Sequence, residues 1–260
     1  MIRGLQIYLM ALKHNFAARM AYRADFIFSS LMSFVSEMFI PLITFFIYEM
    51  GSSFPGWGFY EVLLLQGIFM LSNGVARLTF FGIVSSTLGH VREGTYDLLL
   101  IKPRSTLFLS IANVFSPDSI GTIFAAVYII RLSLDKLVWP GALSWIEFLV
   151  LFLFSLMVLF SFSLFMAGSM FKWVGNSRIY EIFDSITSFG NYPATIFSKS
   201  FRILISNVIP IALLGFFPAS ALLGKEIEGA LSAALVCIIF LALGLCFWRF
   251  MLSKYTSAGG

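Results

Sequence analysis

Three ionisable residues stand inside long apolar stretches of the sequence, where an unpaired charge is costly. Glu37, Arg77 and Asp118 each lie roughly ten residues from the inner end of a predicted membrane span, about 14–17 Å deep at 1.5 Å of helical rise per residue. A lone charge at that depth costs at least ~2.5–3.5 kcal/mol. We therefore expect the three side chains to face the protein interior and Arg77 to pair with Glu37 or Asp118. Such a cluster is either a polar pathway or gate, or a structural ion pair that pins three helices together.

The other titratable residues form no catalytic or metal-binding pattern. His14 and His90 have no acidic or thiol neighbours at ligand spacing, so no metal site is predicted. Glu181 and Asp184 are the only close pair of carboxylates near the predicted inner face, and no histidine accompanies them. The sequence contains no G-x-x-x-x-G-K-[ST], G-x-S-x-G or H-E-x-x-H motif. We expect a chain that is not an enzyme and that holds no cofactor of its own.

A charged stretch interrupts the apolar sequence at "VREGTYDLLLIKPRS", residues 91–105. The pattern predicts a helix that begins near Val91 and ends at Pro103, because proline does not continue a helix. Glu93 and Asp97 would lie four residues apart on one side of it, beside an apolar patch of leucines. A membrane protein could dock onto a soluble partner with such a helix; alternatively, the leucines dip into the lipid headgroups. The candidate docking residues are Arg92, Glu93, Asp97, Leu98, Leu99, Leu100, Ile101 and Lys102.

The composition places these residues in a membrane protein. Hydrophobic residues make up 59% of the chain, charged residues 12%, and the mean hydropathy is +0.93, whereas soluble domains carry about 25% charged residues. We predict an all-α integral membrane protein whose short loops leave no room for a soluble domain. The basic residues are scattered among the apolar stretches, which argues against nucleic acid as a partner. Six membrane spans of suitable length are predicted near 26–48, 60–86, 108–130, 146–171, 201–217 and 229–250, of which the fifth is short and contains Pro210.

The loop charges predict the orientation of the six spans. With the N-terminus in the cytoplasm, three basic residues, Arg131, Lys136 and Lys225, fall on the outer side and thirteen on the inner side. Cytoplasmic loops carry an excess of Lys and Arg, so we expect both termini in the cytoplasm. The inner set consists of Arg3, Lys13, Arg19, Arg23, Arg92, Lys102, Arg104, Lys172, Arg178, Lys199, Arg202, Arg249 and Lys254.

Two further segments are expected at the cytoplasmic surface of the bilayer. Residues 4–24 combine apolar side chains at helical spacing with several basic ones, as an amphipathic interfacial helix does. Residues 178–200 are too polar to span, and Gly190 and Pro193 interrupt them. We expect an interfacial helix there, then a bend and the start of the fifth span. Residues 218–229 would form an outer connection.

Four short stretches resemble one branch of the ABC-2 type transporter permeases. "REGTYDLLLIKPRSTLF" at 92–108 is similar to the R-E-G-T-x-D-x-L-L-x-K-P stretch of that branch, although "PRS" replaces the commoner Pro-hydrophobic-Asn continuation. "YRADFIF" at 22–28 is similar to the start of its first span. "NVIPIALLGFFPASALLG" at 207–224 and "KYTSAGG" at 254–260 are similar to the segment before its last span and to its C-terminal end. The four stretches occur in the family's order along nearly the whole chain.

This resemblance implies one permease domain over residues 1–260, in the cytoplasmic (inner) membrane of a bacterium. It implies a second permease chain, identical or homologous, and two copies of a separate ATPase subunit that binds ATP and Mg²⁺. It also assigns Arg92–Phe108 as the element that couples the permease to the ATPase. The expected function is export of an amphiphilic, lipid-like, glycan or drug-like substrate. The alternatives are a stand-alone channel or secondary carrier, which inverted repeats would favour, and an intramembrane enzyme, which the missing catalytic residues disfavour.

Overall fold

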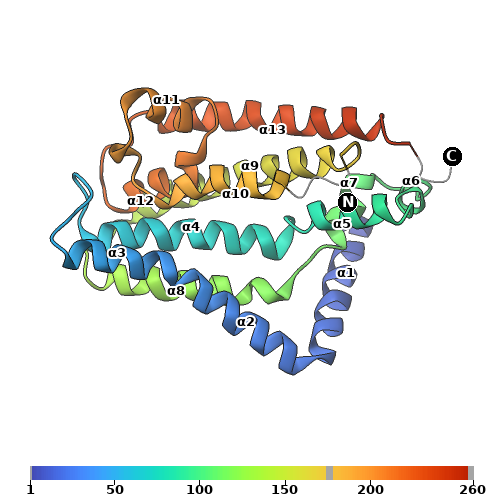
Figure 1. The fold of residues 1–260 in the computed structure, drawn as a ribbon, viewed down its shortest axis with the longest axis horizontal. Helices are drawn as coiled ribbons and strands as arrows, with labels where there is room; N and C mark the ends of the chain where they lie inside the picture. Colours follow the sequence, from blue (N-terminus) through green and yellow to red (C-terminus); the bar gives the residue numbers. More distant parts are fainter. Residues whose placement is uncertain (1, 174–177, 257–260) are drawn as a thin grey trace.

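The structure, a computed structural model, describes residues 2–173 and 178–256, and within these residues it contains helices and no strands. The prediction of an all-α protein is confirmed. Short 3-10 turns at 117–119, 189–191, 194–196 and 211–214 join some of the helices. The helices (Figure 1) are α1 Ile2–Ala21, α2 Arg23–Glu37, α3 Phe39–Glu49, α4 Phe59–Thr79, α5 Ile83–Arg92, α6 Asp97–Leu100, α7 Thr106–Ala112, α8 Ile120–Leu134, α9 Ala142–Ser169, α10 Arg178–Ser188, α11 Lys199–Asn207, α12 Phe216–Leu222 and α13 Ala230–Leu252.

Five helical segments of the described chain are long and apolar enough to cross a membrane. They correspond to the first, second, third, fourth and sixth predicted spans. The third begins later than predicted, because α7 is a separate short helix and a new helical segment starts at Pro117. The five segments are Arg23–Glu49, Phe59–Arg92, Pro117–Leu134, Ala142–Ser169 and Ala230–Leu252.

The long helices α4, α8, α9 and α13 run side by side along the longest dimension of the molecule, and α1 lies across that direction (Figure 1). The tightest pairs are α4 with α8 and α9 with α13. Gly67 and Gly74 of α4 let α8 approach closely, since a Cβ atom at either position would come within 2.8 Å of an isoleucine side chain of α8. Small residues at helix contacts are the usual means by which membrane helices pack.

The bundle has two distinct ends. At one end, which we call the α6 end, lie the first residues of α1, the helix α6 and the last residues of α13 (Figure 1). At the opposite end, the far end, lie the α3–α4 connection, α11 and α12. Ring contacts mark both: Tyr96 lies against Tyr255 at the α6 end, with ring centroids 5.4 Å apart, and Phe54 lies against Tyr192 at the far end, 6.1 Å apart.

The fifth predicted span, 201–217, is wrong as a continuous helix. The structure divides this stretch among α11, a 3-10 turn and the start of α12, all at the far end (Figure 1). Instead the chain passes along the bundle between residues 178 and 192. Ile179 packs in the same cluster as Tyr96, whereas Tyr192 contacts Phe54 at the far end. The interfacial helix predicted within 178–200 is therefore α10, which runs beside α9 rather than across the bundle.

The position of α11 also changes the charge count. Asn207, at the end of α11, accepts a hydrogen bond of 2.8 Å from Ser232 near the start of α13, which is the far end of that helix. Lys199 and Arg202 therefore belong with the far-end residues. Removing these two from the thirteen predicted inner basic residues and adding them to the three outer ones leaves eleven against five. The imbalance keeps its direction.

Candidate functional site

The charged stretch after the second span forms two short helices rather than one. α5 ends at Arg92, and Gly94 has a φ of +66°. Thr95 N–H donates to the carbonyl of His90 at 2.9 Å and Gly94 N–H to that of Val91 at 3.3 Å, the paired bonds of a Schellman C-cap. The prediction of one helix that begins near Val91 and ends at Pro103 is thus wrong, because Gly94 ends the helix earlier. Glu93 and Asp97 consequently share no helix face.

The leucine run after this break divides into an inner and an outer side. Leu99 in α6 is only 6% exposed and packs into the protein. Leu98, Leu100 and Ile101 are 58%, 44% and 79% exposed. We call these three residues the α6 outer face. Lys102 and Arg104 beside it are exposed as well, so this surface is apolar with a basic edge.

Tyr96 anchors α6 in an aromatic cluster made of Tyr96, Phe171, Trp248 and Tyr255. Tyr96 is fully buried; its ring centroid lies 4.9 Å from that of Phe171 and 5.4 Å from that of Tyr255. Phe171 contacts Trp248 at 5.1 Å. Burial raises the pKa of Tyr96 to about 12, against a smaller opposing effect of the hydroxyls of Ser110 and Thr106. Burial also raises the pKa of Tyr255, and the nearby Asp97 carboxylate adds to that rise.

Arg77 of α4 is exposed, contrary to the expectation that it faces the protein interior, and it lines two open cavities. The first, which we call the polar cavity, has a volume of about 550 Å³ and lies among α4, α9 and α10. Its polar lining includes Asn73, Arg77, Glu181 and Asp184. The second cavity, of about 470 Å³, is lined by α2 residues together with Arg77 and Thr122. The shared arginine makes the two cavities neighbours.

The three ionisable residues predicted to cluster lie in this region but are paired differently from the prediction. Asp118 forms an ion pair with Arg19 of α1 instead of Arg77. Glu37 lines the second cavity beside Arg77 and accepts a hydrogen bond of 3.4 Å from the Thr122 hydroxyl. Among the residues that the structure describes, Arg77 forms no ion pair. A role of the cluster as a pathway or gate stays a prediction.

Acidic side chains outnumber basic ones on the cavity walls. Arg77 is the one basic residue in the described lining of the two cavities, and it faces four carboxylates. One of these, Asp25, is also 3.4 Å from Arg19. The others are Glu37, Glu181 and Asp184. The arrangement can bind polar or charged groups of a molecule whose apolar part contacts Leu159, Phe162 and Met166 on α9.

Sequence reasoning did not connect Glu181 and Asp184 with Arg77. Their signal was present: Glu181, Asp184 and Thr187 recur at helical spacing along 178–188, and all three line the polar cavity. This polarity suggested an interfacial helix, but it equally suits a helix whose polar side faces a cavity. In residues 2–173 and 178–256 no three His, Cys, Asp or Glu side chains gather as a metal site requires. The expectation of no metal stays a prediction.

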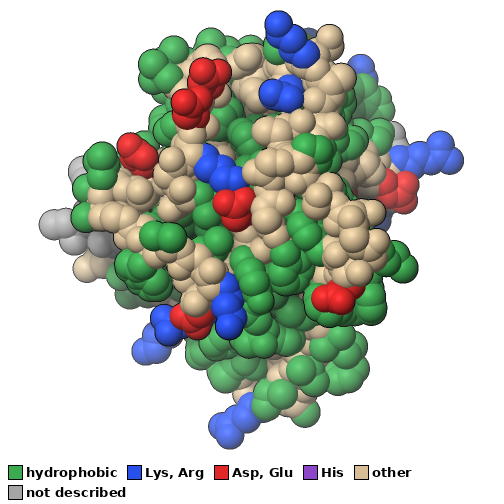
Figure 2. Space-filling model, turned by 90° about the vertical axis from the view of Figure 1, so that its left-hand side faces the viewer, with side chains coloured by type: hydrophobic (Ala, Val, Ile, Leu, Met, Phe, Trp, Pro, Cys, Tyr) green, Lys and Arg blue, Asp and Glu red, His purple; other side chains and the backbone are tan. Residues whose placement is uncertain are grey.

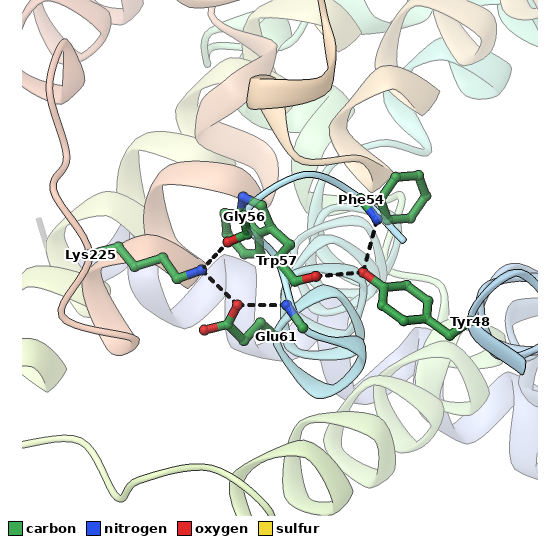
Figure 3. Close-up of polar contacts among 7 residues, drawn as sticks. Tyr48, Phe54, Gly56, Trp57, Glu61 and Lys225 are labelled. Atoms are coloured by element: carbon green, nitrogen blue, oxygen red, sulfur yellow. Dashed lines mark hydrogen bonds and ion pairs between the residues drawn. The ribbon is translucent and has the colours of Figure 1, made fainter. Parts of the chain in front are cut away.

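The far end is held by a second polar network around Lys225 (Figure 3). Lys225 Nζ donates to a Glu61 carboxylate oxygen at 2.6 Å and to the Gly56 carbonyl at 2.9 Å, and lies 4.2 Å from the Trp57 ring centroid. The Tyr48 hydroxyl donates to the Trp57 carbonyl at 2.8 Å. Figure 2 shows this end of the molecule, where acidic and basic side chains are interspersed with hydrophobic ones and form no patch of a single sign.

Comparison with known proteins adds one finding. A family model described as "ABC-2 family transporter protein" matches residues 20–259 of the chain. No curated protein matches, and no solved structure does.

Proposed function

Because the chain belongs to the ABC-2 family of transporter proteins, a family of permeases that associate with ABC ATPases, we propose that it is half of an exporter's membrane pathway. The partners are two copies of a separate ATPase subunit, which bind ATP and Mg²⁺, and a second permease chain, identical or homologous. The chain itself carries out no hydrolysis. The complex resides in the cytoplasmic membrane of a bacterium.

The observation that carries this proposal is the α6 outer face. Three large apolar side chains are exposed, Leu98 and Leu100 on α6 and Ile101 directly after it, and the other side of this short helix is anchored in the bundle. The α6 end is where a soluble domain can reach the chain, and the exposed Lys102 and Arg104 give that surface a polar rim. An apolar centre with a polar rim is typical of a protein interface.

The charge distribution supports a cytoplasmic position for the α6 end. Even with Lys199 and Arg202 counted on the far side, eleven basic residues belong to the inner set and five to the outer set. The first residues of α1 and the last turn of α13 lie at the same end as α6 (Figure 1). Both termini are then cytoplasmic, and α1, which lies across the bundle, rests on the inner leaflet as an interfacial helix.

A sixth crossing is completed by residues 178–192, which run beside α9 from the α6 end to the far end. This segment borders the polar cavity with Tyr180, Glu181 and Asp184. We place the substrate path along this cavity, and its mixed lining suits an amphiphilic molecule. The α2–α3 segment exposes many apolar side chains and is the surface that faces lipid or the second permease chain.

Affinity purification from the native host in lipid nanodiscs tests the proposal. The wild-type chain is expected to recover an ATPase with a P-loop motif. Leu100→Asp and Ile101→Asp should lose it, because a carboxylate in the α6 outer face would be desolvated at the interface. Val138→Asp is the matched control, since Val138 is 93% exposed and lies at the far end, between α8 and α9. An ATPase that binds both Asp variants as well as wild type would exclude the α6 outer face as its docking surface.

A stand-alone channel or secondary carrier is the competing function. It requires substrate flux in proteoliposomes that contain this chain alone, without ATPase or ATP. Flux that appears only after the ATPase and ATP are added supports the exporter.

A further inference from the structure

We propose that the aromatic cluster carries the movement of α6 to helix α9, and through α9 to the wall of the polar cavity. Tyr96 and Tyr255 are the positioning residues of this connection. The inference rests on the proposed function, because it requires an ATPase that displaces α6. It assigns the transmission to the fourth span, rather than to the second and third spans that adjoin α6 in the sequence.

The first step is the attachment of α6 to the bundle. Tyr96 immediately precedes α6 and is fully buried, and Leu99 within α6 is 6% exposed. The α6 outer face stands on the other side of the same helical turn. A displacement of Leu98, Leu100 and Ile101 therefore also moves the Tyr96 ring, because one helical turn connects these residues.

The second step is the contact between the Tyr96 ring and the ends of two long helices. Tyr96 meets Phe171 edge to face at 4.9 Å, and Phe171 follows α9 by two residues. Phe171 in turn meets Trp248 of α13, which is 2% exposed. Close-packed interiors have low compressibility and transmit displacement. Movement of Tyr96 must shift the ends of α9 and α13 or break these ring contacts.

The third step is α9 itself. It is an uninterrupted helix of 28 residues, and its residues Leu159, Phe162 and Met166 line the polar cavity. Spacings of three and four residues place the three side chains on one face. α13 packs along α9, with Gly244 of α13 close to the backbone of Ser161. The two helices can thus move together, and a shift at Phe171 reaches the cavity wall.

The routes through the neighbouring helices are less direct. Between α4 and α5 the helix is interrupted at residues 80–82, and between α7 and Pro117 at residues 113–116. Each break is a place where a displacement of α6 can be absorbed by backbone rotation. On the α9 route Phe171 lies in a turn at residues 170–172, directly after α9, and the helix is continuous from Ser169 to Leu159.

Tyr255 gives the C-terminal segment a part in this connection. It follows α13, and its ring contacts both Tyr96, at 5.4 Å, and Phe171, at 5.8 Å. The Tyr96–Tyr255 contact thus joins one residue from each of two stretches that resemble the family, 92–108 and 254–260.

The experiment measures movement of α9 in the intact complex with its ATPase in nanodiscs. Cys237 is replaced by alanine and Cys246 by serine, and spin labels are attached at Val127→Cys on α8 and Leu153→Cys on α9. Both positions are exposed, 52% and 61%. Double electron–electron resonance spectroscopy measures the distance between the two spin labels, first without nucleotide and then after the complex is trapped with ATP and vanadate. We expect the distance to change on trapping.

The variants Tyr96→Ala and Tyr255→Ala should lose at least half of this change although the complex still hydrolyses ATP. Tyr96→Phe and Tyr255→Phe keep the rings and should retain the full change. If Tyr96→Ala fails to assemble, the Tyr255 pair decides the question, because Tyr255 lies beyond α13 and is partly exposed.

Two results would overturn the inference while the proposed function stands. One is a full distance change in Tyr255→Ala, and the other is an unchanged distance in a wild-type complex that hydrolyses ATP. Failure to obtain any complex with an ATPase would instead refute the proposed function.

Discussion

Arg19 of α1 forms an ion pair with Asp118, which lies just before α8, and its guanidinium is also 3.4 Å from the Asp25 carboxylate of α2. One arginine thus joins three segments of the chain at the corner where α1 meets the bundle. Asp118 is the better buried of the two acids, with a side chain 17% exposed against 66% for Asp25. The Arg19–Asp118 pair is therefore the stronger restraint on α1.

Asp118→Asn should destabilise the attachment of α1 to the bundle. We expect a loss of about 1 kcal/mol, which is toward the upper end for a partly exposed ion pair. Thermal unfolding in detergent, in a double-mutant cycle with Arg19→Gln, measures the coupling between the two residues. Asp135→Asn is the control, because its partner Arg131 and Asp135 itself are both largely exposed. Additive effects of Arg19→Gln and Asp118→Asn would show that the pair contributes nothing.

Lys225→Met should loosen the far end of the protein. The change removes the ion pair with Glu61, the bond to the Gly56 carbonyl and the cation–π contact with Trp57. Charged hydrogen bonds contribute about 1.5–3 kcal/mol each at most, and the side chains here are only partly buried, so we expect a total of about 2 kcal/mol. Hydrogen exchange should rise in residues 54–61. Lys136→Met changes an exposed lysine after α8 and should leave the exchange of residues 54–61 unchanged. Equal exchange rates in the two variants would mean that Lys225 does not stabilise these residues.

The sequence was most informative where a span is long and continuous. Helices α9 (Ala142–Ser169) and α13 are both long, apolar segments. Length and hydropathy alone are therefore enough to predict them. The path of residues 178–192 along the bundle was not predicted for a physical reason: the polar side of α10 lines a cavity, so its hydropathy resembles that of an interfacial helix. At 201–217 the apolar residues predict a span, but in the structure residues 210–215 are buried at the far end while Ile203, Leu204 and Val208 are exposed.

Two local signals near α6 compete, a proline and a glycine, and the glycine decides where the helix ends. Pro103 predicts the end of the helix, but Gly94 ends it earlier by adopting a positive φ that other residues reach only with strain. The pairing of Asp118 with Arg19 and the burial of Tyr96 by Phe171 and Tyr255 depend on contacts between segments far apart in the chain. Spacing within one segment contains no information about such contacts.

Cysteine accessibility should reveal that the polar side of α10 faces the polar cavity. In a chain without its native cysteines, Asp184→Cys is expected to react with a water-soluble thiol reagent, because Asp184 lines the cavity and is exposed. Ile186→Cys, two residues away and packed against the protein core, should react much more slowly. Equal reaction rates at the two positions would contradict this orientation of α10.

The high pKa of Tyr96 predicts a specific loss of stability at alkaline pH. Its pKa in the folded protein is about 12, compared with an ordinary value of 10.0. Because the folded pKa is raised, the contribution is fully present below pH 10 and is lost as the pH rises through 12. A shift of this size corresponds to about 2–3 kcal/mol at most, at roughly 1.4 kcal/mol per pKa unit.

Tyr96→Phe isolates this effect, because it keeps the ring contacts with Phe171 and Tyr255 but has no proton to lose. The difference in unfolding temperature between wild type and Tyr96→Phe should be constant up to about pH 10 and should then shift in favour of the variant. Tyr22→Phe, which changes a tyrosine that is 74% exposed, should follow the wild-type curve. If the wild-type curve stays parallel to that of Tyr96→Phe through pH 12, the Tyr96 hydroxyl must reach solvent. The side chain would then not be buried as the structure indicates.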